Sequence, residues 1–145
     1  MKKKQLEIDV TEFAQAVRTL VRRVRSAAAW QEYSLTEAAV MARLENHGPT
    51  IAAALARAEG MKPQSMGTII ASLERMGVAA RKPHPTDGRQ VNIELTAKGA
   101  AACRTVREAK RTWLAKAIAE LDKKDRETLF EAGKIIRRLA DNDRQ

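Results

Sequence analysis

The fold is decided by residues 62–99, whose sequence is KPQSMGTIIASLERMGVAARKPHPTDGRQVNIELTAKG. In the first third of this stretch, apolar side chains recur at three- and four-residue steps from Met66 onward, a pattern typical of an amphipathic helix. Pro63 suits the first helical position because no backbone N–H is needed there, and Gly77 is a favoured residue just past a helix end. We therefore predict a helix over 63–76.

A change of period follows this helix and predicts a hairpin. Residues 78–82 have the pattern of a strand, and apolar and polar side chains alternate over 90–95, as in a half-buried strand. Between them lie two prolines and then Asp87-Gly88, a dipeptide that favours tight hairpin turns. The sequence thus predicts two strands joined by a turn, directly after a helix.

Two more helices precede this stretch. The first begins at Ser34 or Thr36, either of which can accept hydrogen bonds from free backbone N–H groups, and it ends at Gly48. Thr50 is expected to cap a short helix over 51–58. A short helix, a turn that contains glycine and a second helix with a polar outer face form a helix-turn-helix, which places its second helix in the major groove of DNA.

Long amphipathic helices flank this module, over 8–29 and over 97–140, the latter interrupted at Asp122. Their apolar stripes would be exposed in a monomer, so we expect both segments to pair with a second copy of the chain. The predicted fold class is mainly α with a small β-hairpin. It is a winged helix-turn-helix over 34–95 with long N- and C-terminal dimerisation helices, all in a single domain that spans 1–145.

The composition favours a polyanionic partner. The chain has 145 residues and a formal net charge of +9, and each Lys or Arg at a phosphate releases condensed counterions. Aromatic residues make up 3%, too few for a platform that stacks on single-stranded bases. Cys103 is the only cysteine, which excludes an intrachain disulfide and fits a cytoplasmic protein.

The sequence has no pattern of a membrane protein, a metal site or an enzyme. No apolar run approaches the length of a membrane helix, and the N-terminal lysines are not followed by the apolar segment of a signal peptide. The only histidines, His47 and His84, do not combine with Cys103 into metal-ligand spacing. Because a nucleophile elbow and a phosphate-binding glycine loop are missing too, we expect neither an enzyme nor a cofactor.

Two groups of side chains are the predicted contacts with double-stranded DNA. Polar side chains of the second helix are of a size to reach base edges, and the free N–H groups at its N-terminus can bind a phosphate. The hairpin carries Arg89 at its tip, where it can enter the narrow minor groove, and Asp87 can hold that arginine in position. The predicted DNA-binding residues are Thr50, Lys62, Gln64, Ser65, Thr68, Ser72, Arg75, Arg81, Lys82, Asp87 and Arg89.

Nearly the whole chain resembles the MarR (multiple antibiotic resistance regulator) family. The resemblance rests on Leu73–Val78, Arg81, Asp87-Gly88-Arg89 and Leu95–Gly99 at fixed spacings, and on Leu35-Thr36 and Gly48-Pro49. It implies a homodimeric regulator of transcription that binds a pseudo-palindromic operator through two winged helix-turn-helices, as a repressor released by a small aromatic effector. It also assigns the wing-tip arginine to Arg89, its acidic partner to Asp87, and recognition-helix contacts to about Gln64, Ser65 and Thr68.

Two positions depart from the family's pattern. Gly67 lies inside the predicted recognition helix, where glycine costs about 1 kcal/mol relative to alanine. It either permits close approach to DNA or loosens the helix. Thr68 stands where some relatives carry a basic residue, so we expect modest direct readout, with more affinity from the wing and the backbone.

Two further roles compete with plain packing. Cys103 lies near Arg104 and Arg107, which can stabilise a thiolate, although an inert helical cysteine is the favoured interpretation. Several aromatic and methionine side chains could line an effector pocket or belong to the hydrophobic core. The core is the favoured interpretation, because such residues at helical spacing are usually buried. The candidate pocket residues are Trp30, Met41, His47, Met61 and Trp113.

Two alternative functions use the same residues. A sequence-independent architectural DNA-binding protein is favoured by the charge, and competition with bulk DNA distinguishes it from a regulator. A winged-helix protein-interaction module never touches DNA, and it predicts no salt-dependent DNA affinity.

Overall fold

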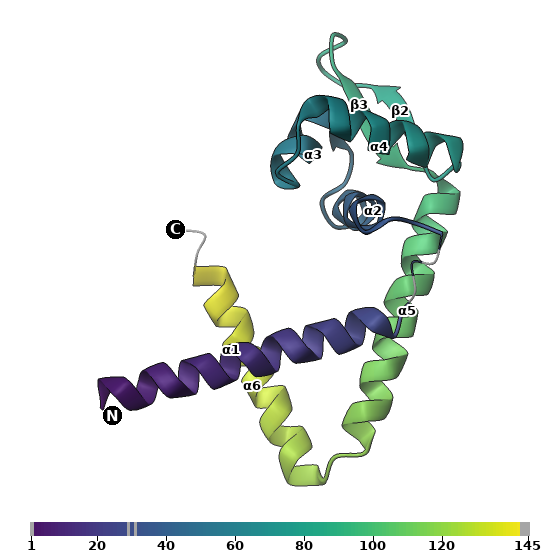
Figure 1. Cartoon of the computed structure of the whole chain (residues 1–145). Helices are drawn as coiled ribbons and strands as arrows, with labels where there is room; N and C mark the ends of the chain where they lie inside the picture. Colours follow the sequence, from purple (N-terminus) through teal and green to yellow (C-terminus); the bar gives the residue numbers. More distant parts are fainter. Residues whose placement is uncertain (1, 29, 31, 143–145) are drawn as a thin grey trace. The chain divides into compact units, whose positions relative to one another are not determined.

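A computed structural model of the chain describes residues 2–28, 30 and 32–142 (Figure 1). It confirms a mainly helical fold with a small antiparallel sheet. The elements of the described residues are α1 (Lys3–Ser26), α2 (Leu35–His47), β1 (Thr50–Ile51), α3 (Ala52–Ala58), α4 (Pro63–Arg75), β2 (Ala79–Pro83), β3 (Val91–Leu95), α5 (Ala97–Ala119) and α6 (Lys123–Asp141).

The chain divides into two compact units. Residues Met1–Ala27 and Ala109–Gln145 form one, called the helical unit below, and residues Ala28–Glu108 form the other, called the winged unit. Helix α5 begins in the winged unit and ends in the helical unit. The winged unit contains the whole helix-turn-helix and hairpin that the sequence predicts.

A single hydrophobic core holds the winged unit together. Helices α2, α3 and α4 each turn one apolar face inward, and β2 and β3 close the other side. Burial of a large aliphatic side chain contributes about 1.5–3 kcal/mol, which is the main force that fixes α4 in place. The largest fully buried side chains of this core are Val40, Met41, Leu55, Met66, Ile70, Leu73, Val78, Ile93 and Cys103.

The sheet has three strands in the order β1-β3-β2, all antiparallel. Strand β1, which the sequence did not predict, pairs Thr50 with Ile93. The expectation that Thr50 caps α3 is therefore wrong, since the N-cap position is Ile51 and no side chain caps that helix. Two residues are too few to show an alternating pattern, so the pairing with β3 decides the structure here rather than local sequence.

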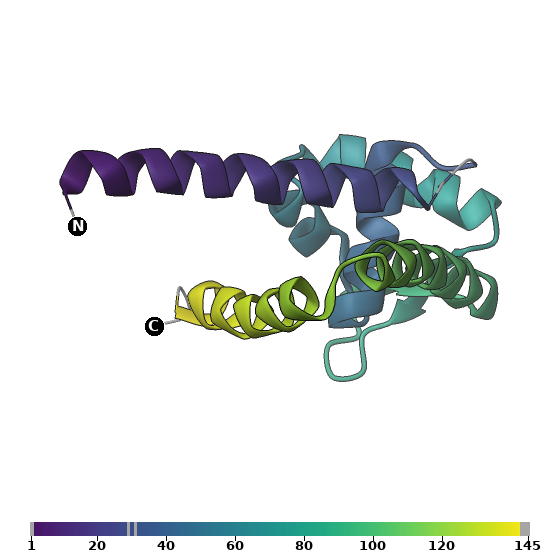
Figure 2. The ribbon, with the colours of Figure 1, turned by 90° about the horizontal axis from the view of Figure 1, so that it is seen from below.

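The loop between β2 and β3 projects from the rest of the winged unit (Figure 2). The Asp87-Gly88 pair does not form the tight turn expected of it, because Gly88 lacks the positive φ that such a turn requires. The strands end at Pro83 and Val91 instead, and the residues between them form a longer loop. Pro85 is the physical reason, since it has no backbone N–H with which to continue the pairing of β2 beyond Pro83.

Most helix ends follow the sequence prediction. Ser34, not Thr36, is the N-cap of α2: it accepts a hydrogen bond from the Glu37 N–H, and Glu37 accepts one from the Ser34 N–H. Asp122 caps α6 by accepting a hydrogen bond from the Asp125 N–H at 2.7 Å. Helix α1 differs from the predicted range of 8–29. It covers Lys3–Ser26, because the lysines before its apolar stripe join the first turn. Residue 29 lies outside the described residues.

A close junction joins the end of α4 to the start of α5. The Thr96 hydroxyl donates to the Gly77 carbonyl oxygen at 2.6 Å, and Lys98 Nζ donates to the Met76 carbonyl oxygen at 2.9 Å. Gly99 is buried, and a Cβ there would overlap the Val78 carbonyl oxygen. The run Leu95–Gly99 therefore fixes the position from which α5 leaves the sheet.

Candidate nucleic-acid interface

Helix α4 presents a polar face to solvent. Its apolar residues point into the core, while Gln64, Ser65 and Thr68 in its first two turns are exposed. Pro63 occupies the first turn, and no side chain caps the helix at Lys62. The N–H groups of the first turn are therefore available to a phosphate, as expected for a helix that docks end-on against DNA.

Gly67 lies within this face, and a Cβ added there would meet nothing within 4 Å. Internal packing therefore does not require glycine at this position. Thr68 donates its hydroxyl hydrogen to the Gln64 carbonyl oxygen at 3.3 Å, which leaves its oxygen lone pairs for an outside donor.

Ser72 is half-buried, and its hydroxyl is occupied inside the winged unit. It donates to Glu37 Oε2 at 2.8 Å, while Glu37 Oε1 accepts the Ser34 N–H at 2.9 Å. The backbone hydrogen bond from Ser34, followed by the bond from Ser72, lowers the pKa of Glu37. Ser72 thus ties α4 to the capped end of α2, a role that sequence reasoning missed, and its contact with DNA stays a prediction.

The basic side chains at the end of α4 and on β2 differ in their partners. Arg75 is exposed in the last turn of α4. Arg81 donates to Glu74 Oε1 at 2.7 Å, and Lys82 pairs with Glu94 across the hairpin at 3.0 Å. Each of these two pairs is close to neutral, so Arg81 and Lys82 attract phosphates less than their charge alone predicts.

The wing carries Arg89 far out into solvent, with 97% of its side chain exposed. The expected partnership with Asp87 is present: the Arg89 N–H donates to Asp87 Oδ1 at 3.1 Å, and Arg89 Nε lies 4.0 Å from the same oxygen. Asp87 therefore holds the backbone of Arg89 more firmly than its guanidinium group, and the guanidinium group remains accessible to DNA.

Sequence reasoning missed one residue of the wing, His84. Its Nδ1 accepts hydrogen bonds from the backbone N–H groups of Asp87 at 3.1 Å and Thr86 at 3.3 Å. A lone histidine in a turn gives no sequence signal for this role, because it depends on how the loop folds back.

The candidate effector-pocket residues lie in different surroundings. Met41 is fully buried, and Trp30 and Met61 pack against the same core, which agrees with the core interpretation. His47 is exposed in the last turn of α2. Trp113 belongs to the helical unit, where Arg23 lies over its ring at 5.8 Å from the centroid.

Cys103 fits the inert interpretation. It is 2% exposed in the core, and burial raises the pKa of its thiol, which disfavours the thiolate that oxidants attack. Arg107, expected as a thiolate-stabilising neighbour, forms an ion pair with Glu45.

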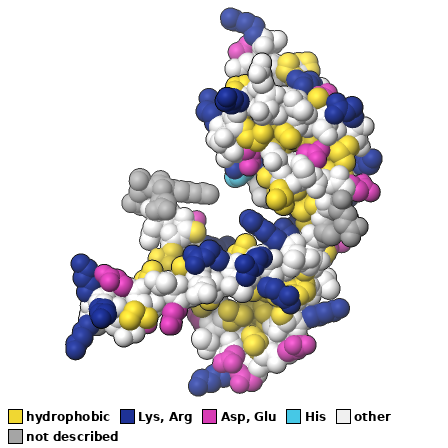
Figure 3. Space-filling view, in the orientation of Figure 1, with side chains coloured by type: hydrophobic (Ala, Val, Ile, Leu, Met, Phe, Trp, Pro, Cys, Tyr) yellow, Lys and Arg dark blue, Asp and Glu magenta, His cyan; other side chains and the backbone are white. Residues whose placement is uncertain are grey.

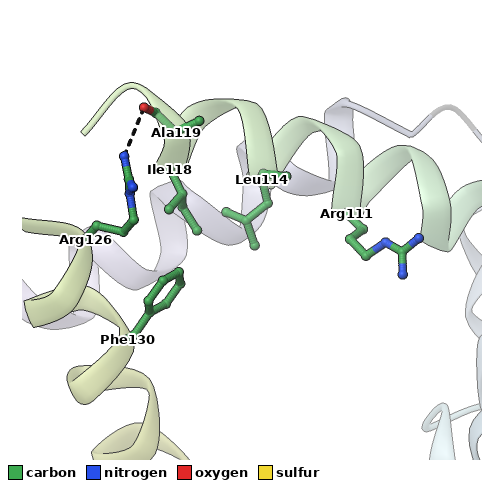
Figure 4. Close-up of a pocket in the computed structure, with 7 residues that line it drawn as sticks. Arg111, Leu114, Ile118, Ala119, Arg126 and Phe130 are labelled. Atoms are coloured by element: carbon green, nitrogen blue, oxygen red, sulfur yellow. Dashed lines mark hydrogen bonds between the residues drawn. The ribbon is translucent and has the colours of Figure 1, made fainter. Parts of the chain in front are cut away.

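The helical unit exposes apolar side chains on α1 and α6 (Figure 3). Neither helix has a buried residue in the part of the chain that is described. Phe130 of α6 points toward Ile118 of α5 across a groove of about 450 Å³ that has Arg111 and Arg126 on its rim (Figure 4). The exposed apolar residues on the two helices are Leu6, Ile8, Val10, Phe13, Val17, Leu20, Val21, Leu129, Phe130, Ile135, Ile136 and Leu139.

The described residues meet the requirements of neither a metal site nor a membrane-spanning helix. They contain no group of three or more His, Cys, Asp or Glu side chains that could hold a metal ion. No helix among them is both long and apolar enough to cross a membrane.

Comparison with known proteins identifies the family. The model of the MarR family matches residues 33–91. An HTH-type transcriptional regulator of Mycobacterium bovis is 35% identical over 131 residues, which cover 90% of this chain and 92% of the relative. A regulator of the same type from Mycobacterium leprae is 34% identical over the same shares of the two chains.

Solved structures agree. The crystal structure of RV1404 from Mycobacterium tuberculosis superposes with a TM-score of 0.79 at 25% identity, over 95% of this chain and 96% of that one. A MarR family protein from Bacillus stearothermophilus shares the fold, with a TM-score of 0.78 at 18% identity over 100% of this chain and 99% of that one. The chain therefore belongs to the MarR family and is a DNA-binding transcriptional regulator, not an enzyme.

Proposed function

We propose that two copies of this chain bind a pseudo-palindromic operator in a sequence-specific manner. In each copy, α4 lies in the major groove and Arg89 of the wing enters the adjacent minor groove. The observation that carries this proposal is the pairing of two exposed features on one unit. Helix α4 has an uncapped N-terminus and a polar face, and the wing tip carries an arginine that is almost entirely exposed.

The side chains of α4 divide into two kinds of contact. Gln64, Ser65 and Thr68 are neutral, and Gln can form a bidentate contact with adenine, so these residues read bases. Lys62 and Arg75 flank them with positive charge and bind phosphates, which positions the helix without reading the sequence. Direct readout by neutral groups favours a specific regulator over an architectural protein.

The dimer is supported by the apolar surface of the helical unit. A soluble monomer rarely exposes many large apolar side chains along two helices, and such surfaces usually mark interfaces. A second copy would cover them, and its two-fold symmetry would match two half-sites of an operator. Family membership argues against the protein-interaction alternative, since the relatives in the comparison are HTH-type transcriptional regulators.

The finer regulatory role stays a prediction. We expect a repressor that a small aromatic ligand releases from DNA, and a cytoplasmic location. Transcription in vitro from a template that carries the operator tests the first part. Repression predicts fewer transcripts on addition of protein, and an increase in transcript would make the protein an activator.

The direct test of the proposed function is selection of genomic fragments. Purified protein is incubated with sheared genomic DNA and an excess of bulk competitor DNA, and the bound fragments are sequenced. The proposal predicts enrichment of a short inverted repeat. Uniform recovery of all fragments would instead support the architectural alternative, and recovery of no DNA at low salt would leave only a role without DNA contact.

A further inference from the structure

His84 occupies a restricted position in the wing. It lies between Pro83 and Pro85, which fix their own φ angles and restrict the backbone of the residue that precedes each of them. Its backbone N–H donates to the Gln90 carbonyl oxygen at 3.1 Å, on the return side of the loop. The backbone that carries the imidazole is therefore restricted on both sides.

The ring closes the loop through one nitrogen. Nδ1 accepts from the N–H groups of Asp87 at 3.1 Å and Thr86 at 3.3 Å, and it lies 3.4 Å from the Thr86 hydroxyl oxygen. Loop backbone groups of this kind normally bond to water or to Asx side chains. Here an imidazole takes the place of the Asx side chain.

A chain of hydrogen bonds runs from this ring to the wing tip. The N–H of Asp87 is held by His84, the Asp87 carboxylate accepts the N–H of Arg89, and the Asp87 carbonyl oxygen accepts the N–H of Gln90 at 3.0 Å. His84 thus fixes Asp87, and Asp87 fixes the backbone that carries the Arg89 side chain.

We propose that His84, through Nδ1 of its neutral ring, is the positioning residue of the wing and sets where Arg89 meets DNA. The part of this proposal that concerns DNA rests on the proposed function. A protonated ring carries hydrogens on both nitrogens and cannot accept from either N–H group. The closure therefore requires a ring whose Nδ1 carries no hydrogen.

Charged groups lie beside the ring without taking its place. Asp87 and Arg89 lie in the loop, and the Lys82–Glu94 ion pair spans β2 and β3 beside it.

The first test needs no DNA. Nuclear magnetic resonance of the full chain at pH 8 records which ring nitrogen of His84 carries hydrogen, together with the hydrogen exchange of the Thr86 and Asp87 amides. At pH 8 we expect hydrogen on Nε2 only. His84→Ala should lower amide protection about fivefold, the equivalent of one hydrogen bond.

His84→Asn is the matched variant, since its side-chain oxygen can accept from the same amides. It should retain the protection of the wild type at pH 8, whereas His84→Ala should not. Hydrogen on Nδ1 at pH 8, or amide protection unchanged by His84→Ala, overturns the proposal.

The second test uses the fragment that genomic selection enriches most. At pH 8, His84→Ala should weaken binding about fivefold in the wild-type background and have no further effect in Arg89→Ala, because the residue acts through Arg89. Equal effects in both backgrounds would overturn the positioning role. If the wild type bound no DNA, the proposed function would fail, while the amide measurement would still decide whether His84 closes the wing.

Discussion

At the residue scale, the exposed side chains of α4 separate base readout from phosphate binding. Gln64 is neutral and exposed near the N-terminus of the helix, whereas Arg75 is charged and lies in its last turn. Removal of a base contact changes preference among sequences, and removal of a phosphate contact changes the dependence of affinity on salt.

We therefore expect Gln64→Ala to relax preference at one base pair per half-site by about 1–3 kcal/mol and to leave the salt slope nearly unchanged. Arg75→Ala should lower the salt slope by about one unit and weaken all sequences alike. The measurement is binding to an operator and its single-base variants at several salt concentrations. If Gln64→Ala weakened every variant equally, Gln64 would only position the helix.

Arg89 lies in the loop between β2 and β3, and 97% of its side chain is exposed. Arg89→Ala should weaken binding more on operators with A·T-rich flanks than with G·C-rich flanks, because a narrow minor groove attracts arginine. Fluorescence anisotropy on the two operators measures this difference. Equal affinity of mutant and wild type on both flanks, with the fold intact, would remove the wing from the mechanism.

At the element scale, the first turn of α2 joins a helix cap to the packing of α4. Glu37 accepts hydrogen bonds from Ser34 and Ser72, and both lower the pKa of its carboxyl group. A carboxylate with a lowered folded-state pKa stabilises the protein above its unfolded-state pKa. The stabilisation is lost as the pH falls through the folded-state value.

Glu37→Gln keeps the shape of the side chain and removes its charge. We expect it to lower the free energy of unfolding by about 0.5–1.5 kcal/mol at pH 7, the range for a single hydrogen bond. The difference from wild type should vanish below about pH 3, where the carboxyl group of the wild type is protonated too. Urea unfolding from pH 3 to 7 measures it, with Glu120→Gln as the control at an exposed site. A difference that does not change with pH would contradict the role of the charge.

The elements differ in how far sequence could predict them. Helices α2 and α4 carry apolar periodicity and end signals such as Ser34, Pro63 and Gly77, so local sequence decides them. Strand β1 has two residues and exists because β3 pairs with it. Strand β1 therefore depends on its pairing with β3, which a pattern of neighbouring residues in the sequence does not indicate.

The residues of the candidate site also divide into those that the sequence predicts and those that depend on tertiary contacts. Exposure of Gln64 and Arg89 follows from their places on a helix face and a hairpin tip. The bond between Ser72 and Glu37 joins residues 35 positions apart, and the bonds to His84 depend on a loop that folds back on itself. Both needed the three-dimensional structure, because neither leaves a spacing in the sequence.

At the scale of the whole molecule, large apolar residues of α1 and α6 are exposed, and we propose that a second copy of the chain covers them. Phe130 of α6 is 55% exposed and lies on the groove between α5 and α6. Phe130→Glu should weaken self-association at least about 100-fold, since truncation of a buried aromatic alone costs about 3–5 kcal/mol. Sedimentation at micromolar concentration measures the oligomeric state.

The matched control is Leu35→Glu. Leu35 is 93% exposed in the first turn of α2, in the winged unit, so its substitution should leave the oligomeric state unchanged. A wild-type chain that sediments as a monomer, or Phe130→Glu and wild type with the same association constant, would contradict the proposed interface.

We propose that one dimer reads two half-sites with its two α4 helices, and a change in the spacing between the half-sites tests this. Half-sites of such dimers are about 10 bp apart, so insertion of about 5 bp turns one of them to the opposite face of the duplex. Affinity is measured for the selected operator and for the same operator with this insertion. We expect the insertion to lower affinity about 100-fold or more, because only one of the two linked contacts can then form. Equal affinity for both duplexes would contradict it.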